Sequence, residues 1–326
     1  MPSALITGIA GQDGSYLAEF LLEKGYEVAG LILEEDEERL KAMSGLMDRV
    51  RLLPGDLTDM DSLIQAVEIS RPDEVYNLAS QSSIIRSWED PYLTAEVTGL
   101  GAVRLLETVR RFAPRARFFQ ASSSELFGNP EVCPQTEETP FAPRNPYGHA
   151  KLLAHALVGV YRERHGLFAS AGILYNHESP RRPPEHVTRK ITRAAARIKA
   201  GLDDRLVLGD IKAVRDWGYA PDFVRAFWLM LQQPGPEDFI VATGEPRTVE
   251  DFCRLAFQAV SLDYRDFLQV NPKLFRSWET RPLIGNPAKA RQRLGWEPET
   301  SFPDLVRLMV EADLAKIESA GEPAHG

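Results

Sequence analysis

The first thirty-odd residues constrain the fold most, because a glycine-rich turn lies there between two apolar segments. Residues 4–6 are expected to form a buried strand, and residues 16–24 place their apolar side chains on one face of a helix. Three glycines at three-residue spacing lie in the turn between them: Gly8, Gly11 and Gly14. Without Cβ atoms the backbone can turn tightly, and a pyrophosphate can approach the N–H groups of the helix N-terminus. A second apolar strand at 26–33 completes a βαβ unit, which favours a dinucleotide site over glycines that merely punctuate a loop.

Strand and helix patterns alternate from there to residue 175. Apolar runs predict strands at 50–53, 74–78, 117–122 and 168–175, and helical spacing predicts helices at 60–69, 94–112 and 147–165. Alternating βα units with short connections are typical of a parallel sheet with helices on both faces. We therefore expect a doubly wound, Rossmann-like α/β domain at 1–175.

Beyond residue 175 the pattern is less regular. Closely spaced prolines indicate a loop at 180–184, and helices are predicted at 188–199, 223–231 and 249–259. We expect a smaller, discontinuous mixed α/β lobe at 176–326, with some segments returning to the first domain.

Charge and cysteine content restrict the partners and the compartment. A net charge of −9 over 326 residues argues against nucleic acid or an anionic membrane as the main partner. Cys133 and Cys253 are the two cysteines, without metal-ligand spacing, which predicts a reducing compartment and no metal site. There is neither a signal-peptide pattern nor an apolar run of membrane-spanning length. These features predict a soluble, cytoplasmic protein.

Two stretches carry residues suited to acid–base chemistry. Ser122-Ser123-Ser124-Glu125 follows a predicted strand, at the sheet edge where ligands bind in open α/β folds. Tyr147 and Lys151 are four residues apart on a predicted helix, so they share a face. A lysine ammonium beside a phenol lowers the pKa of the phenol and makes it usable as a base. A surface pair and a helix cap are the plain alternatives, but the two stretches together, after a βαβ unit, favour catalysis.

These motifs resemble the GDP-mannose 4,6-dehydratase family of extended short-chain dehydrogenase/reductases, and the resemblance covers nearly the whole chain. The GxxGxxG spacing is similar to that of the superfamily. The matching segments are 7–14, 55–57, 76–79, 122–126, 145–147, 175–182, 187–190, 215–218, 242–245, 285–290 and 294–296. Four of them are characteristic of the family itself, namely 175–182 (YNHESPRR), 187–190, 215–218 and 242–245.

The resemblance implies conversion of GDP-mannose to GDP-4-keto-6-deoxymannose by internal hydride transfer from C4 to C6 through a tightly bound nicotinamide. Tyr147, with Lys151 and the nicotinamide charge beside it, would take the proton of O4, which Ser123 would also bind. Glu125 would remove the C5 proton and protonate the leaving C6 hydroxyl. One alternative stays open, a C4 epimerase or reductase of a related nucleotide sugar, and the presence of Glu125 disfavours it. A non-catalytic nucleotide-sensing protein is the other alternative, and such proteins often lack the tyrosine or lysine.

The resemblance also assigns binding residues. At NAD(P) it places Gly8, Gly11, Gln12, Asp13, Gly14, Glu34, Asp56, Leu57, Leu78, Ala79, Gln81, Ser82, Tyr147, Lys151, His177 and Arg182. At the nucleotide sugar it places Ser83, Asn176, Glu178, Val187, Lys190, Arg215, Arg276 and Glu279. The basic residues between 181 and 190 are expected to form an anion site together: Arg181, Arg182, Arg189 and Lys190. Helices 94–112 and 147–165 resemble those that pair in dimers of the superfamily, which implies a homodimer and leaves a tetramer open.

Three departures from the family pattern bear on specificity. The sequence LEEDEE at 33–38 stands where the family carries paired arginines and a serine-rich loop. Carboxylates such as Glu34 would repel a 2′-phosphate and accept a hydrogen bond from a 2′-hydroxyl, so NAD is predicted over NADP. A solvated helix start is the other explanation of this acidic run. The bulkier residues at 85–88 and the altered segment 276–281 leave the sugar open.

Overall fold

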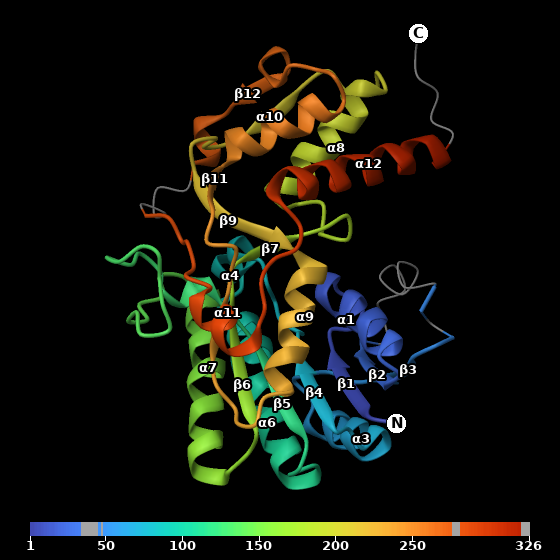
Figure 1. Ribbon diagram of the computed structural model, residues 1–326, viewed down its shortest axis with the longest axis vertical. Coiled ribbons are helices and arrows are strands. Elements are labelled where there is room, and N and C mark those ends of the chain that lie inside the picture. The colour runs from blue at the N-terminus through green and yellow to red at the C-terminus, as the bar shows by residue number, and fades with distance from the viewer. Residues whose placement is uncertain (34–44, 47, 276–280, 321–326) are drawn as a thin grey trace.

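The computed structural model describes residues 1–33, 45–46, 48–275 and 281–320. Within these residues, seven parallel strands form a sheet in the order β10-β6-β5-β4-β1-β2-β3 (Figure 1). Their bounds are β1 Ser3–Thr7, β2 Glu27–Ile32, β3 Arg51–Pro54, β4 Glu74–Asn77, β5 Arg117–Ser123, β6 Ala169–Leu174 and β10 Phe239–Val241. The chain reverses its direction across the sheet between β1 and β4, which is the position where such sheets bind ligands. The predicted doubly wound sheet is confirmed.

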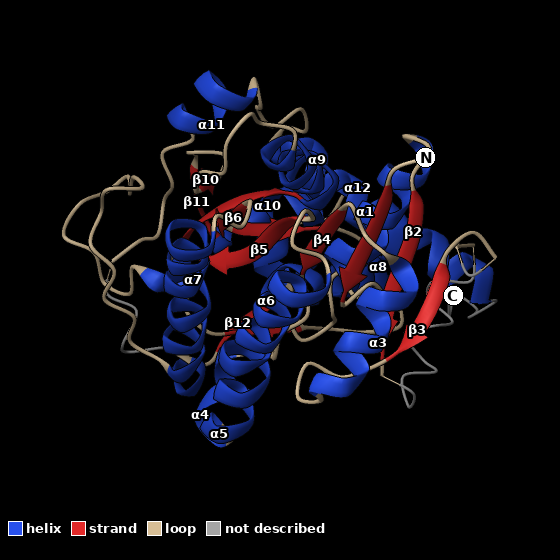
Figure 2. Cartoon of the chain, turned by 90° about the horizontal axis from the view of Figure 1, so that it is seen from below, coloured by secondary structure: helices blue, strands red, loops and turns tan. Residues whose placement is uncertain are grey.

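Helices cover both faces of the sheet, as Figure 2 shows from below. One face carries α1 Gln12–Glu23, α9 Ala220–Leu231 and α11 Ala288–Leu294, and the other carries α3 Met60–Ser70, α6 Gly101–Phe112 and α7 Pro146–His165. Adjacent strand residues point to opposite faces, so Phe118 packs with α6 while Phe119 packs with α9. The layers follow from this alternation.

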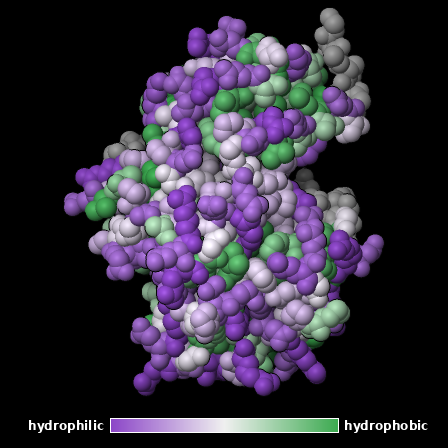
Figure 3. Space-filling view, in the orientation of Figure 1, coloured by the Kyte–Doolittle hydropathy of each residue, from purple (hydrophilic) through white to green (hydrophobic). Residues whose placement is uncertain are grey.

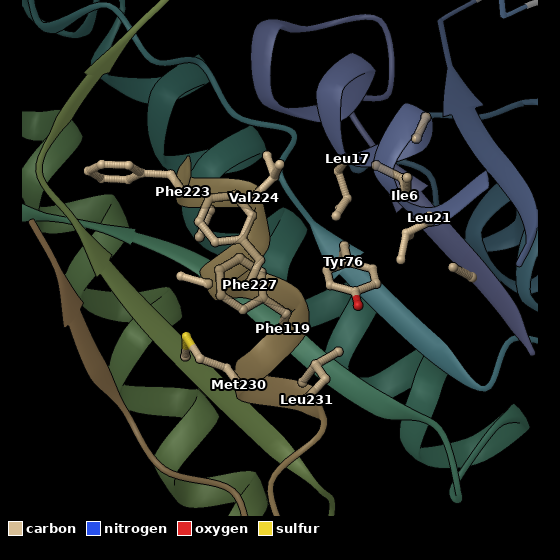
Figure 4. Packing of buried hydrophobic residues seen from close by; sticks show 14 of the residues in the cluster. Ile6, Leu17, Leu21, Tyr76, Phe119, Phe223, Val224, Phe227, Met230 and Leu231 are labelled. Carbon is tan, nitrogen blue, oxygen red and sulfur yellow. The ribbon is translucent and has the colours of Figure 1, made fainter. Parts of the chain in front are cut away.

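The interior below α9 is rich in aromatic rings. Phe227 of α9 lies on Phe119 of β5, and Leu17 of α1 lies on the same side of the sheet (Figure 4). The rings of Phe119 and Phe227 stack with centroids 4.5 Å apart. Burial of each such ring contributes about 2–3 kcal/mol. This packing joins a helix from the second half of the chain firmly to the sheet.

The helix predicted at 94–112 is interrupted. It consists of α5 Pro91–Thr94, a π-helical turn η1 Ala95–Leu100 and then α6, and a short helix α4 Ile84–Glu89 precedes it. A Cβ at Gly101 would lie 2.7 Å from the Cβ of Leu57, so the helix passes very close to the loop after β3. The wider turn lies where this close approach begins, which apolar spacing alone does not reveal.

A smaller lobe packs above the carboxyl edge of the sheet (Figure 1). Its helices are α8 Val187–Lys199, α10 Val249–Ala259 and α12 Phe302–Ala320, which share one apolar core. Its strands are β7 Asn176–Glu178, β9 Val214–Tyr219 and β11 Pro246–Thr248 in one sheet, and β8 Leu206–Leu208 and β12 Leu268–Val270 in another. Short 3₁₀ turns complete the elements: η2 Ser124–Leu126, η3 Tyr264–Asp266 and η4 Pro272–Leu274.

The surface of the visible face is mainly hydrophilic, with apolar side chains gathered in parts of the upper lobe (Figure 3). No helix in the described part of the chain is long and apolar enough to cross a membrane.

Candidate active site

The glycine turn before α1 has the geometry of an anion site. Gly8 has a φ of +69°, and a Cβ there would lie 2.9 Å from the Cα of Ala79. A Cβ at Gly14 would lie 2.2 Å from the carbonyl oxygen of Gly8, so α1 begins directly on the turn. Gly11 is the N-cap residue, and no side chain caps the first N–H groups of the helix. These N–H groups and the helix dipole fit the pyrophosphate of a dinucleotide.

The first turn of α1 is bonded to the segment after β6. Gln12 Nε2 donates to the carbonyl oxygen of His177 over 3.1 Å, and Ser179 Oγ donates to Gln12 Oε1 over 2.8 Å. Asp13 Oδ2 lies 2.8 Å from His177 Nε2, while His177 Nδ1 lies 2.7 Å from the carbonyl oxygen of Tyr175. Burial raises the pKa of Asp13, but the charge and hydrogen bond of His177 outweigh it, and the pKa is lowered. Burial lowers the pKa of His177, but Asp13 outweighs it, and the pKa is raised.

Thr7, at the carboxyl end of β1, holds the loop that follows β4. Its Oγ1 donates to Asn77 Oδ1 over 2.7 Å and accepts from the N–H groups of Leu78 and Ala79 over 3.2 and 3.1 Å. The structure therefore brings Leu78 and Ala79 against the glycine turn, as expected for a shared ligand.

The remaining predicted residues of this edge lie on the loops after β3 and β4: Asp56, Leu57, Gln81, Ser82 and Ser83. Asp56 Oδ1 accepts from the N–H of Thr58 over 2.8 Å. Gln81 Nε2 donates to the carbonyl oxygen of Ser83 and to Thr94 Oγ1, each over 3.0 Å. Leu57 is buried and Ser82 is exposed. These bonds fix the shape of the two loops.

Lys151 and Tyr147 lie on the first turns of α7, beside the end of β5. Lys151 is 3% exposed, and its Nζ donates to the carbonyl oxygen of Ala121 over 2.8 Å. Burial lowers the pKa of Lys151 to about 8, against the opposing charge of Asp13. The distance from Nζ to the ring centroid of Tyr147 is 5.7 Å. The two side chains therefore share one space, as their spacing predicts.

The expected lowering of the Tyr147 pKa by Lys151 is wrong for the chain alone. Burial raises the pKa of Tyr147 to about 12, and a hydrogen bond with Ser123 opposes the rise only in part. The ammonium of Lys151 is directed at the Ala121 carbonyl oxygen instead of the phenol. A further positive charge is needed before Tyr147 can act as a base near neutral pH.

Glu125 is the middle residue of the 3₁₀ turn after β5 and is held by its neighbours. Its backbone N–H donates to Ser123 Oγ over 3.2 Å, and its Oε2 accepts from Asn145 Nδ2 over 2.8 Å. Ser123, Glu125 and Tyr147 therefore meet at one point, where the strand ends and α7 begins. Asn145, which sequence reasoning did not assign to the site, joins them.

The expected anion cluster at 181–190 does not form. Arg181 donates to Ser15 Oγ over 3.0 Å and to Glu19 Oε1 over 2.6 Å, and its guanidinium stacks over Tyr16. Arg189 is 4% exposed and forms a two-fold ion pair with Asp313 of α12. Both arginines are already neutralised by carboxylates, so their prediction as anion ligands is wrong.

Arg182 is ion-paired as well, but one of its nitrogens makes no hydrogen bond. Arg182 Nε lies 3.3 Å from Glu178 Oε2, yet this buried nitrogen has no hydrogen-bond partner. Glu178 is 1% exposed and also accepts from Thr188 Oγ1 over 2.6 Å. Lys190 is exposed on α8. An orphan guanidinium nitrogen fits an anionic ligand.

Arginines meet across two strands of the lobe. Arg215 of β9 stands directly opposite Arg247 of β11 in the antiparallel register. The next residue, Asp216, is fully buried and accepts from the N–H and Oγ1 of Thr243 and from the N–H groups of Gly244 and Gly285. Burial raises the pKa of Asp216. Arg247 is paired with Glu245 over 2.6 Å, and its guanidinium lies over the ring of Phe302. Like charges at opposed positions of a sheet are unfavourable, and no sequence pattern signals this pairing.

The structure places two further predicted site residues and does not describe three others. Asn176 begins β7 and Val187 begins α8, both half-buried at the base of the lobe. Glu34, Arg276 and Glu279 lie outside the described residues. Over the described ranges, no group of three or more His, Cys, Asp or Glu side chains could hold a metal ion.

Comparison with known proteins agrees with this geometry. A family described as GDP-mannose 4,6 dehydratase matches residues 5–309. GDP-mannose 4,6 dehydratase 1 of Arabidopsis thaliana is 48% identical, over 95% of this chain and 89% of its own length. GDP-mannose 4,6-dehydratase of Yersinia enterocolitica is 44% identical, over 96% of this chain and 94% of its own.

Solved structures share the fold. UDP-glucose 4-epimerase of Thermotoga maritima, solved with UDP-glucose, has a TM-score of 0.85 at 26% identity, covering 96% of this chain and 99% of its own. UDP-glucose 4-epimerase of Thermus thermophilus, solved with NAD, has a TM-score of 0.83 at 28% identity. The match covers 95% of this chain and 98% of the epimerase chain. RMD of Pseudomonas aeruginosa, solved with NADPH, has a TM-score of 0.83 at 24% identity. The match covers 96% of this chain and 99% of the RMD chain. Similar structures thus hold a nicotinamide dinucleotide of either kind.

Proposed function

The chain belongs to the GDP-mannose 4,6-dehydratase family, and from this membership we propose that it removes water from GDP-mannose to give GDP-4-keto-6-deoxymannose. The observation that carries the proposal is the meeting of Glu125 with Ser123 and Tyr147 at the end of β5. A carboxylate beside the tyrosine is what a dehydration across C5 and C6 requires.

Tyr147 is the proposed base at the sugar O4. With a pKa of about 12, its phenol is protonated at neutral pH in the chain alone. When bound, the oxidised nicotinamide supplies a positive charge and exchanges a hydride with C4 and then C6 of the sugar. Lys151 holds a second positive charge on the same helix face, and Ser123 binds Tyr147 and the O4 oxygen together.

Glu125 is the proposed acid and base at C5 and C6. A ketone at C4 acidifies the C5 proton, which the carboxylate removes. The same proton then passes to the C6 hydroxyl, which leaves as water, so Glu125 returns to its starting state and a C5–C6 double bond remains. As the hydride enters C6, C5 takes up a proton from water and Tyr147 releases the O4 proton to water, so the sugar loses one water overall. An epimerase has no step that needs this carboxylate.

The cofactor is proposed to lie across the glycine turn, with its pyrophosphate at α1 and its nicotinamide toward Tyr147. The uncapped α1 terminus, the loop of Leu78 and Ala79, and the orphan Arg182 Nε support this. We retain the preference for NAD over NADP from the carboxylates beginning at Glu34. Denaturing the purified protein and identifying the released nucleotide tests it; release of NADP would refute the preference.

The nucleotide sugar is proposed to extend from Tyr147 into the upper lobe. Arg215 and Lys190 are the proposed diphosphate ligands, with Asn176, Glu178 and Val187 along the path and Ser83 at the hexose. Support for an anion there is the presence of two arginines at opposed positions of β9 and β11, of which Arg247 is paired with Glu245. Arg276 and Glu279 stay proposed contacts of the ribose and base, from the sequence alone.

We propose a homodimer formed by the α4–α6 segment and α7, with a tetramer as the alternative. Its support is a set of exposed apolar side chains on this face: Ile85, Trp88, Tyr92, Leu93, Leu100, Leu153 and Val160. Tyr92 is 78% and Trp88 54% exposed, which is unusual for such large apolar groups. A cytoplasmic location is proposed with it, supported by two unpaired cysteines.

Incubation with GDP-mannose and either nicotinamide dinucleotide tests the proposed function. We expect a product lighter by one water, with no net consumption of the dinucleotide. An isomer of unchanged mass would favour the epimerase, and binding without conversion would favour a nucleotide-sensing protein.

A further inference from the structure

Asn145 uses both ends of its side-chain amide at the start of α7. It is the N-cap residue, and its Oδ1 accepts from the N–H of Gly148 over 2.8 Å. Its Nδ2 donates to Glu125 Oε2 over 2.8 Å. The side chain is 4% exposed, so these two contacts are made away from bulk water. One residue therefore connects the helix cap to the carboxylate.

The orientation of this amide is determined by chemistry. A backbone N–H can only donate, so the amide oxygen must face Gly148. The NH₂ group must then face Glu125, where it can only donate. Glu125 Oε2 is consequently an acceptor, which favours the ionised carboxylate over the protonated acid.

Close packing keeps the two segments together. A Cβ at Gly148 would lie 2.9 Å from the carbonyl oxygen of Glu125, so the first turn of α7 rests on the backbone of the 3₁₀ turn. The Glu125 N–H is bonded to Ser123, which in turn bonds Tyr147. Glu125 is thus held at its N–H, at its carbonyl group and at its carboxylate.

We propose that Asn145 is a positioning residue for the acid–base step at C5 and C6, holding Glu125 ionised and aimed at the sugar. The proposal rests on the proposed dehydratase function. The proton that Glu125 takes from C5 goes to the departing C6 hydroxyl, and Asn145 neither gains nor loses a proton.

Other charged groups also act on this corner of the site. Tyr147 of α7 interacts electrostatically with Glu125, with Arg182 after β7 and with Asp13 of α1. Lys151 lies one turn further along α7. His149 Nδ1 lies 3.0 Å from the carbonyl oxygen of Asn145. The wild type and the Asn145 variants share all of these groups, so a difference between their pH profiles reports the change of the side chain at 145.

Two substitutions separate capping from positioning. Asn145→Ser keeps an oxygen that caps α7, but its side chain is one carbon shorter and does not reach Glu125. Asn145→Asp keeps the cap and the shape but turns a carboxylate oxygen toward Glu125. We measure kcat against pH, and the rate at which the C5 hydrogen of the keto product exchanges in D₂O, which requires removal of the C5 proton but no hydride transfer.

We expect the acid limb of both profiles to move to higher pH, by about one unit for Asn145→Ser and further for Asn145→Asp. As a matched control, Ser301→Ala removes the oxygen that caps the N–H of Asp304 in α12, far from the sheet edge. It should lower the thermal midpoint and leave both profiles unchanged.

The outcomes are separable. If the wild-type protein does not dehydrate GDP-mannose, the proposed function and this inference both fall. If the wild-type protein is active and the Asn145→Ser limbs stay in place, only the role of Asn145 is refuted. If Asn145→Ser does not fold, Asn145→Asp decides the question. An acid limb at the same pH in Asn145→Asp and in the wild type would refute the inference as well.

Discussion

The carboxyl edge of the sheet and the lobe above it hold their charged side chains differently. At the edge, Tyr147 and Lys151 share a helix face, and Glu125 follows a strand, so short stretches of chain bring them together. In the lobe, Arg181 pairs with Glu19, and Arg189 pairs with Asp313, more than a hundred residues away in each case. Local spacing thus indicates a site where one strand and one helix form it. It does not indicate which basic residues of a loop stay available for a ligand.

The largest expected effect tests the edge. Glu125→Gln should keep the fold and the cofactor but slow dehydration by about 10²–10⁴-fold, because the C5 proton has no acceptor. Steady-state turnover and product mass measure this. Tyr147→Phe is the companion variant, and no reduced nicotinamide should form in it. Wild-type turnover in Glu125→Gln would break the mechanism.

The next effect tests the lobe. Arg189→Ala should lower the free energy of unfolding by about 3–5 kcal/mol, because Asp313 would keep a buried, unpaired charge. Denaturant titration measures it. The double variant Arg189→Met with Asp313→Leu should recover most of the loss. If Arg189→Ala weakened GDP binding with unchanged stability, Arg189 would be a ligand after all.

A smaller effect compares two arginines of the lobe. Arg215→Ala should weaken GDP binding about 10–100-fold, because a charged hydrogen bond to phosphate is lost, and should leave NAD binding unchanged. Calorimetric titration with each nucleotide measures both. Arg181→Ala is the matched control, since its exposed pair with Glu19 contributes under about 1 kcal/mol. Equal weakening of both nucleotides by Arg215→Ala would contradict the assignment.

The smallest effect concerns the contact between the two regions. The His177 pKa is raised, so its contribution is present below about pH 6.5 and is lost as pH rises through the folded value. The Asp13 pKa is lowered, so its contribution is present above 3.8 and is lost as pH falls through the folded value. Asp13→Asn should therefore lose stability mainly between these limits, by about 1–2 kcal/mol. Denaturant titrations across pH measure it, and a pH-independent difference would contradict the ion pair.

The sequence by itself determined the layered sheet and the center of the site. Apolar runs of strand length alternate with helical spacing, and the alternation admits few topologies. The glycine turn, the strand end at Ser123 and the i, i+4 pair of Tyr147 and Lys151 are local features, so the fold places them as their spacing predicts. The sequence did not predict the π-helical interruption at η1, because its cause is the contact of Gly101 with Leu57, which joins segments distant in the chain.

The tertiary structure decided which polar groups are paired. Asn145 reaches Glu125, Arg247 faces Arg215, and Arg189 is bound by Asp313, yet none of these partners lies within one helical turn of the other. The same packing raised the pKa of Tyr147, since burial acts more strongly there than the lysine one turn away. The residue type determines which charge a side chain can carry, whereas its partners and its exposure to water depend on every segment that folds against it.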